Sequence, residues 1–120
     1  MGYAVGMINA VHSILFARDA DAARAFFTDV LELNSVDAGG GWQIFALPPA
    51  ELAIHPADTG GGHELYLMTD DLDRTLAQLR ECGVKVAAEP SDQGWGVLAS
   101  IEVPGFGPLG LYEPRHAVPR

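Results

Sequence analysis

The stretch Val11-His12-Ser13-Ile14-Leu15-Phe16-Ala17-Arg18-Asp19 begins the pattern on which the chain is built. Ile14 and Phe16 alternate with their neighbours, which predicts a β-strand over residues 8–17. Asp19 is a favourable N-cap residue, and apolar residues at helical spacing after it predict a helix from about residue 20 to 33. One polar residue, His12, opens this otherwise apolar strand.

The same strand-to-helix pattern returns 52 residues later. Glu64 opens the second predicted strand as His12 opens the first, and Asp71 stands where Asp19 stands before the first helix. The shared spacing indicates an internal repeat, with convergence of two ordinary strand-helix units as the alternative.

The ends of the two halves also match. His55 and Glu113 each precede a proline that ends a predicted strand, and they lie 58 residues apart. A glycine-rich linker over 58–62 separates the halves, which span about 8–57 and 62–114. Each half is predicted as β-α-β-β-β, so all 120 residues are expected to form one α+β domain made of two modules.

The composition excludes several classes of protein. Of the 120 residues, 48% are hydrophobic and 19% are charged, which is typical of a globular domain with a core. The net charge of −9 repels phosphate groups and argues against nucleic acid as a partner, and no basic run suggests a membrane surface. The apolar stretches are strand-sized, no signal peptide is evident, and the lone Cys82 cannot form an internal disulfide. We therefore expect a cytoplasmic protein.

Four residues at repeat-matched positions, His12, His55, Glu64 and Glu113, are types that bind metals. A mixed set of imidazole nitrogens and carboxylate oxygens suits Zn, Ni, Mn, Co or Fe(II). Their neighbours on the same strand face are apolar, so a polar group placed there needs a partner. Taken singly, each is more typical of a hydrogen-bonded strand residue or a solvated strand end. Together they favour a metal centre.

Aromatic residues supply candidates for a ligand-binding cleft. Trp42, Phe45, Trp95 and Phe106 are suited to stacking on a flat ligand, with core packing as the alternative. Tyr66 is suited to donating a hydrogen bond to a metal-bound oxygen, and core packing is again the alternative.

The histidine-led strand before an aspartate-capped helix, the repeated halves and the closing Leu111-Tyr112-Glu113-Pro114 resemble the vicinal oxygen chelate superfamily. This superfamily includes glyoxalase I, extradiol dioxygenases and bleomycin resistance proteins. The resemblance implies two βαβββ modules forming an eight-stranded, incompletely closed barrel, and a homodimer. It also implies metal ligands at the first and last strands of the modules, where the four candidate ligands stand.

The resemblance implies three functions. The first is metal-dependent lyase or isomerase chemistry on a small oxygenated substrate, with Glu113 or Glu64 as the general base. The second is an Fe(II) dioxygenase of the extradiol type. The third is a metal-free protein that binds a small molecule, as bleomycin resistance proteins do. The ligand order His, His, Glu, Glu differs from the alternating His, Glu, His, Glu of most glyoxalase I enzymes. Candidate ligands at all four positions nevertheless favour the metal-dependent lyase or isomerase, with the dioxygenase and the metal-free binding protein as alternatives.

Overall fold

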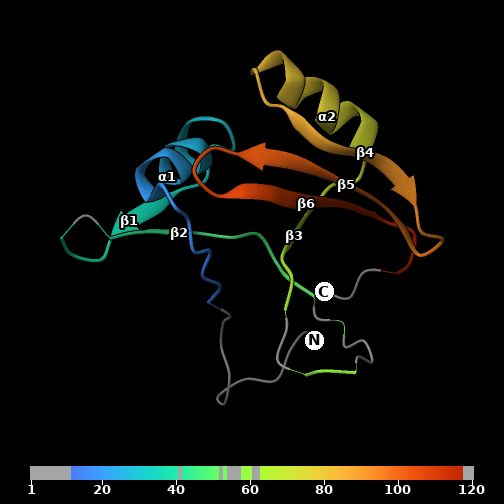
Figure 1. The fold of residues 1–120 in the computed structure, drawn as a ribbon, viewed down its shortest axis with the longest axis horizontal. Coiled ribbons are helices and arrows are strands. Elements are labelled where there is room, and N and C mark those ends of the chain that lie inside the picture. The colour runs from blue at the N-terminus through green and yellow to red at the C-terminus, as the bar shows by residue number, and fades with distance from the viewer. Residues whose placement is uncertain (1–11, 41, 52, 54–57, 61–62, 118–120) are drawn as a thin grey trace.

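The computed structural model describes residues 12–40, 42–51, 53, 58–60 and 63–117 (Figure 1). Two helices and six strands are assigned within these ranges. In chain order they are α1 (Ala20–Asp29), β1 (Ser35–Asp37), β2 (Gln43–Phe45), β3 (Tyr66–Met68), α2 (Leu72–Glu81), β4 (Val86–Asp92), β5 (Gly96–Val103) and β6 (Gly107–Pro114). The α+β class predicted from the sequence is confirmed.

The second half has the predicted order of one strand, one helix and three strands. Its sheet has the strand order β3-β6-β5-β4, with β3 parallel to β6 and the other pairs antiparallel. Helix α2 lies across one face of this sheet (Figure 1). Asp71 caps the helix, since its side chain accepts a hydrogen bond of 3.1 Å from the backbone N–H of Arg74. Gly83, with φ of 84°, lets the chain leave the other end.

The first half is less complete than the sequence predicts. Residues 12–17 form no strand, residues 8–11 lie outside the described part, and the predicted strand over 51–55 is described only at 51 and 53. Ile14 and Phe16 are 57% and 87% exposed, so their alternation is not stabilised by burial within the chain. The described part therefore has a two-stranded and a four-stranded sheet, and no closed eight-stranded barrel.

Two predicted boundaries also shift. Helix α1 ends at Asp29 rather than near residue 33, and Glu32 takes a left-handed conformation with φ of 57°. Strand β4 continues through Pro90 to Asp92, although Pro90 and the following Ser91 and Asp92 are residue types that favour a loop. Because β4 is an edge strand, Pro90 can sit in it without removing a hydrogen bond from the sheet.

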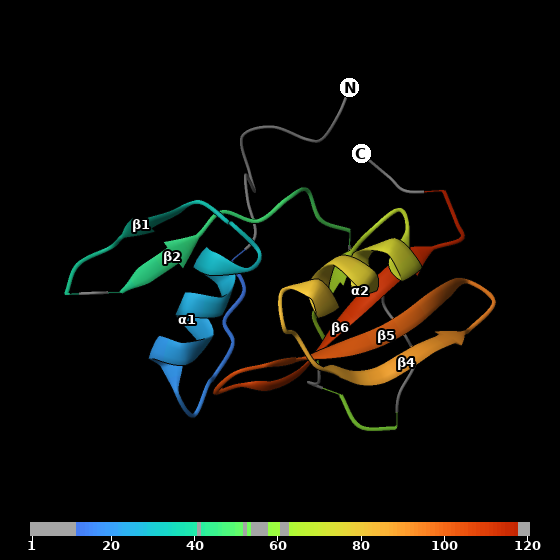
Figure 2. The ribbon, with the colours of Figure 1, turned by 90° about the horizontal axis from the view of Figure 1, so that it is seen from above.

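Both halves contribute to one hydrophobic core. Helix α1 supplies Phe26 and Phe27, and α2 supplies Leu72 and Leu76, which pack in the same cluster as Ile101 of β5. The start of α1 is also fixed to the turn between β5 and β6, because the N–H of Asp19 donates to the carbonyl of Gly105 at 3.0 Å. In Figure 2, α1 lies beside β1 and β2, and α2 lies over the four-stranded sheet of the second half.

The alternation along β5 and β6 determines which side chains are available to a site. Ile101, Leu109 and Leu111 belong to the core that α2 covers. Their neighbours Ser100 and Gly110 therefore point to the opposite face of the sheet, which α2 leaves uncovered. None of the helices in the described ranges has the length and apolarity that a membrane span needs.

Candidate functional site

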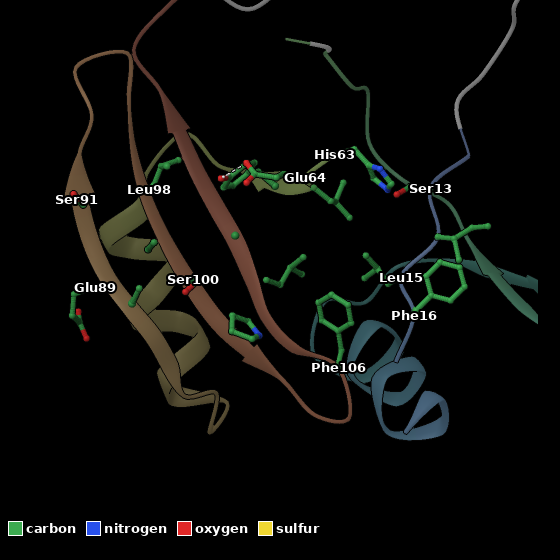
Figure 3. Close-up of a pocket in the computed structure, with 18 residues that line it drawn as sticks. Ser13, Leu15, Phe16, His63, Glu64, Glu89, Ser91, Leu98, Ser100 and Phe106 are labelled. Atoms are coloured by element: carbon green, nitrogen blue, oxygen red, sulfur yellow. Dashed lines mark hydrogen bonds between the residues drawn. The ribbon is translucent and has the colours of Figure 1, made fainter. Parts of the chain in front are cut away.

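A cavity of about 640 Å³ lies on the uncovered face of the sheet. Strands β4 and β5 form one wall, and the segment 13–16 before α1 forms the facing wall (Figure 3). Most of the lining is apolar, and it comprises Ile14, Leu15, Phe16, Leu65, Ala88, Leu98, Ala99, Phe106, Pro108 and Leu109. The size and apolarity are those of a small-molecule site.

The polar lining is acidic or neutral. It consists of Ser13, His63, Glu64, Tyr66, Glu89, Ser91 and Ser100, and no lysine or arginine is among the described residues that line the cavity. Glu89 is neutralised from outside, because Arg80 donates to its two carboxylate oxygens at 2.9 and 2.8 Å. Glu64 has no such cationic partner within the described residues. The cavity thus has one carboxylate available to a basic or hydrogen-bond-donating ligand.

Glu64 and Tyr66 act as a pair at this cavity. The hydroxyl of Tyr66 donates a hydrogen bond of 2.9 Å to Oε1 of Glu64. This hydrogen bond, with smaller effects of burial and of the Glu64 charge, raises the pKa of Tyr66 above its ordinary value. Tyr66 is therefore a neutral phenol at physiological pH, and its hydrogen bond orients the carboxylate of Glu64.

Glu113 lies on the other face of the sheet. Its Oε1 accepts a hydrogen bond of 2.8 Å from the backbone N–H of Leu72, the first residue of α2. A carboxylate is stabilised there because the first N–H groups of a helix lack internal partners and carry partial positive charge. The structure thus gives Glu113 a helix-capping contact, and its role as a metal ligand stays a prediction.

The register of β3 and β6 explains why the two glutamates do not meet. Tyr66 pairs with Gly110 and Leu67 pairs with Leu111. The even-numbered residues of both strands therefore point to one face of the sheet, and the odd-numbered residues point to the other. Glu64 shares the face of Tyr66, to which it is hydrogen bonded, whereas Glu113 shares the face of Leu111. Since Glu64 is even-numbered and Glu113 is odd-numbered, the two carboxylates lie on opposite sides of the sheet.

The structure describes one of the two histidines of the predicted metal centre. His12 is exposed at the start of the described part, and His55 lies outside the described residues. Within the described ranges no three His, Cys, Asp or Glu side chains are grouped so that they could hold a metal ion. Because His55 is not among these residues, the metal role of the four predicted ligands stays a prediction.

Of the aromatic residues predicted to line a ligand-binding cleft, some line the cavity and the others lie in the core or on the surface. Tyr66 and Phe106 line the cavity. Phe45 packs in the core with its ring 5.7 Å from that of Phe27. Trp42 is 68% exposed, with the guanidinium of Arg24 5.6 Å from its ring.

Trp95 belongs to a polar and aromatic cluster at the other end of β6. Its ring centroid lies 5.4 Å from that of Tyr112, whose hydroxyl is hydrogen bonded to Nε2 of His116. Oε2 of Glu51 lies 3.4 Å from the same nitrogen. Burial, and secondarily the charge of Glu51, raise the pKa of Tyr112. This cluster attaches the segment after β6 to Glu51.

Several residues that line the cavity were not among the site candidates named from the sequence. Leu98 and Ser100 could have been found, because they alternate with the apolar core positions of β5. Phe16 was assigned to a strand face, and no local signal marks it as a cavity wall. Gly110 has no side chain, so its residue type gives no reason to name it as a site candidate.

These features agree with the family to which the sequence points. Residues 9–115 match the Glyoxalase/Bleomycin resistance protein/Dioxygenase superfamily. The chain belongs to this superfamily. The resemblance noted in the sequence is confirmed, and the βαβββ order of the second half is that of its modules. Among curated proteins, no relative matches the chain.

Solved structures support the same fold. TnmS3, an antibiotic binding protein from Streptomyces sp. CB03234, is 26% identical, with 91% of this chain and 98% of that chain covered and a TM-score of 0.65. A lactoylglutathione lyase from Agrobacterium tumefaciens is 18% identical, with coverage of 89% and 95% and a TM-score of 0.61. A superfamily member from Sphaerobacter thermophilus DSM 20745 is 23% identical, with coverage of 88% and 98% and a TM-score of 0.62.

The capping role of Glu113 predicts a loss of stability when its carboxylate is removed. Glu113→Ala should lower the free energy of unfolding by about 1–2 kcal/mol, because the N–H of Leu72 loses its acceptor. Glu113→Gln, which keeps an acceptor oxygen, should lose less. Urea unfolding measures both, with Glu102→Ala on the exposed side of β5 as the matched control. Unchanged stability in Glu113→Ala would contradict the capping role.

Proposed function

We propose that this superfamily member is a small-molecule binding protein that holds its ligand in the cavity beside β3, β5 and β6 without a metal ion. The observation that carries the proposal is the lining of the cavity, which is mostly apolar and has a few converging polar groups. Such a lining provides burial for a ligand and hydrogen bonds that orient it, and neither contribution needs a catalytic group.

The charges of the lining indicate the class of ligand. The carboxylate of Glu64 faces a cavity to which no described lysine or arginine contributes. An anionic ligand would be repelled there, whereas a planar or apolar molecule with a protonated amine gains a charge-assisted hydrogen bond. We therefore expect an apolar, basic ligand of drug-like size.

The enzymatic hypotheses have less support. A metal-dependent lyase, isomerase or Fe(II) dioxygenase needs at least three donors that converge on one ion. Glu64 and Glu113 belong to opposite faces of the sheet, and Glu113 already accepts a hydrogen bond from α2. The name of TnmS3, an antibiotic binding protein that is 26% identical over most of both chains, also favours a binding role.

We further propose that the protein is a homodimer whose interface includes Ile14 and Phe16. Phe16 is 87% exposed and Ile14 is 57% exposed, although both line the cavity. Large apolar side chains so exposed beside a ligand site are typical of protein interfaces. A second chain that covers them would also close the open side of the cavity.

The cavity predicts binding of a planar cation. The probe 9-aminoacridine, a tricyclic aromatic cation, should bind saturably, and anthracene-9-carboxylate, a tricyclic anion, should bind at least about tenfold more weakly. Fluorescence titration measures both. Ser100→Trp fills the cavity and should abolish binding, whereas Ala77→Trp on the exposed side of α2 should not. No binding of the cation, or binding that Ser100→Trp leaves unchanged, would contradict the proposal.

Metal analysis separates the binding role from the enzymatic ones. Protein purified without a chelator should contain no stoichiometric Zn, Ni, Mn, Co or Fe, and adding these ions should not raise the thermal midpoint. The control is the same measurement on His12→Ala and Glu64→Ala. Stoichiometric metal in the wild type that is lost in these variants would instead support the metal-dependent enzyme.

The dimer proposal predicts a specific effect of charge at position 16. The wild type should have twice the mass of one chain in light scattering after gel filtration, and Phe16→Glu should shift it towards the monomer. Leu47→Glu, at another exposed apolar side chain that does not line the cavity, is the matched control. A monomeric wild type would rule out the dimer.

A further inference from the structure

Gly110 and Tyr66 form an unusually close contact at the floor of the cavity. The two residues are paired across β3 and β6, and both line the cavity. A Cβ atom at position 110 would overlap Cδ1 of Tyr66 and would lie 2.5 Å from its Cε1. The Tyr66 ring therefore rests against the backbone of β6 in the space that any other residue's side chain would fill.

The position of the ring is fixed from two further sides. Its hydroxyl donates to Glu64, and its centroid lies 6.4 Å from that of Tyr112 in an edge-to-face arrangement. Gly110 points to the cavity side of the sheet, since its neighbour Leu111 faces the core and does not line the cavity. A side chain at position 110 would therefore push the ring away from the sheet and into the cavity.

We propose that Gly110 is a specificity-determining position of the ligand site. Because Gly110 lets the Tyr66 ring lie against β6, it sets the depth of the cavity. The Tyr66 hydroxyl then directs the Glu64 carboxylate towards the ligand. This inference rests on the proposed binding function. Gly110 acts through Tyr66 and does not itself supply a chemical group, so it is a positioning residue.

Gly96 and Tyr112 form a similar contact between a glycine and a tyrosine ring in the same sheet, but away from the cavity. A Cβ atom at Gly96 would overlap Cε1 of Tyr112 and would lie 3.0 Å from the carbonyl oxygen of Glu113. Neither Gly96 nor Tyr112 lines the cavity, and Tyr112 is 7% exposed. Gly96 therefore serves as a matched control for Gly110, since both glycines accommodate a tyrosine ring but only one does so at the cavity.

The experiment compares 9-aminoacridine affinity in the wild type, Gly110→Ala and Gly96→Ala. Gly110→Ala should weaken binding about tenfold, the change expected when one aromatic contact is lost. Gly96→Ala should lower thermal stability but leave the affinity within about twofold of the wild type. Equal affinities of Gly110→Ala and the wild type, or equal losses in both variants, would overturn the role of Gly110 while leaving the binding function intact.

A double-mutant cycle keeps the test decisive if Gly110→Ala folds poorly. Tyr66→Ala removes the ring and should weaken binding by itself, and adding Gly110→Ala to it should cost no further affinity because no ring is left to displace. A further loss in the double variant would overturn the proposal. In the wild type, the Gly110 Hα resonances should show a ring-current shift that Tyr66→Ala abolishes. If the wild type binds no 9-aminoacridine, the proposed function and this inference both fail.

Discussion

The short parallel ladder between β3 and β6 is the constraint on which the site depends. It comprises only three residue pairs, Tyr66 with Gly110, Leu67 with Leu111 and Met68 with Tyr112. Because side chains alternate along each strand, this register sends Leu67 and Leu111 into the core beneath α2 and leaves Tyr66 and Gly110 on the open face. A slip of one residue would exchange the two faces, and burial of the leucines strongly disfavours it.

On the sheet face that α2 covers, Glu113 has a structural contact, although the sequence made it a candidate catalytic residue and metal ligand. Glu113 satisfies the N–H of Leu72 while Asp71 satisfies that of Arg74, so the first turn of α2 has two acidic acceptors. Both contacts are favoured by the unpaired N–H groups and the partial positive charge at a helix start. The charge at position 113 therefore stabilises the packing of α2 on its own sheet.

The open face combines features that suit recognition of a small molecule. The ring of Tyr66 lies against Gly110 on the cavity side, its hydroxyl donates to Glu64, and the buried ring of Tyr112 supports it from within the sheet. The solved structures with a similar fold include a lactoylglutathione lyase and an antibiotic binding protein. The fold alone thus does not decide between catalysis and binding, and the residues that face the cavity carry the argument.

The sequence by itself determined the class of the fold and the plan of its second half. The caps Asp19 and Asp71, the leucines of α2 and the alternation in β5 are local signals, and each produced the expected element. The internal repeat and the closing Leu-Tyr-Glu-Pro were enough to indicate the superfamily, because they record the order of elements along the chain. Glu64, Tyr66 and Phe106 could likewise be named as candidates by residue type.

Only the tertiary structure decided which candidates come together. The faces of Glu64 and Glu113 depend on the register between strands that are distant in sequence, and a repeat alignment does not encode that register. The exposure of Ile14 and Phe16 depends on whether another surface covers them, which no local pattern reveals. Gly110 matters through the space that it leaves for the Tyr66 ring, and the absence of a side chain gains meaning only when the neighbouring strand is in place.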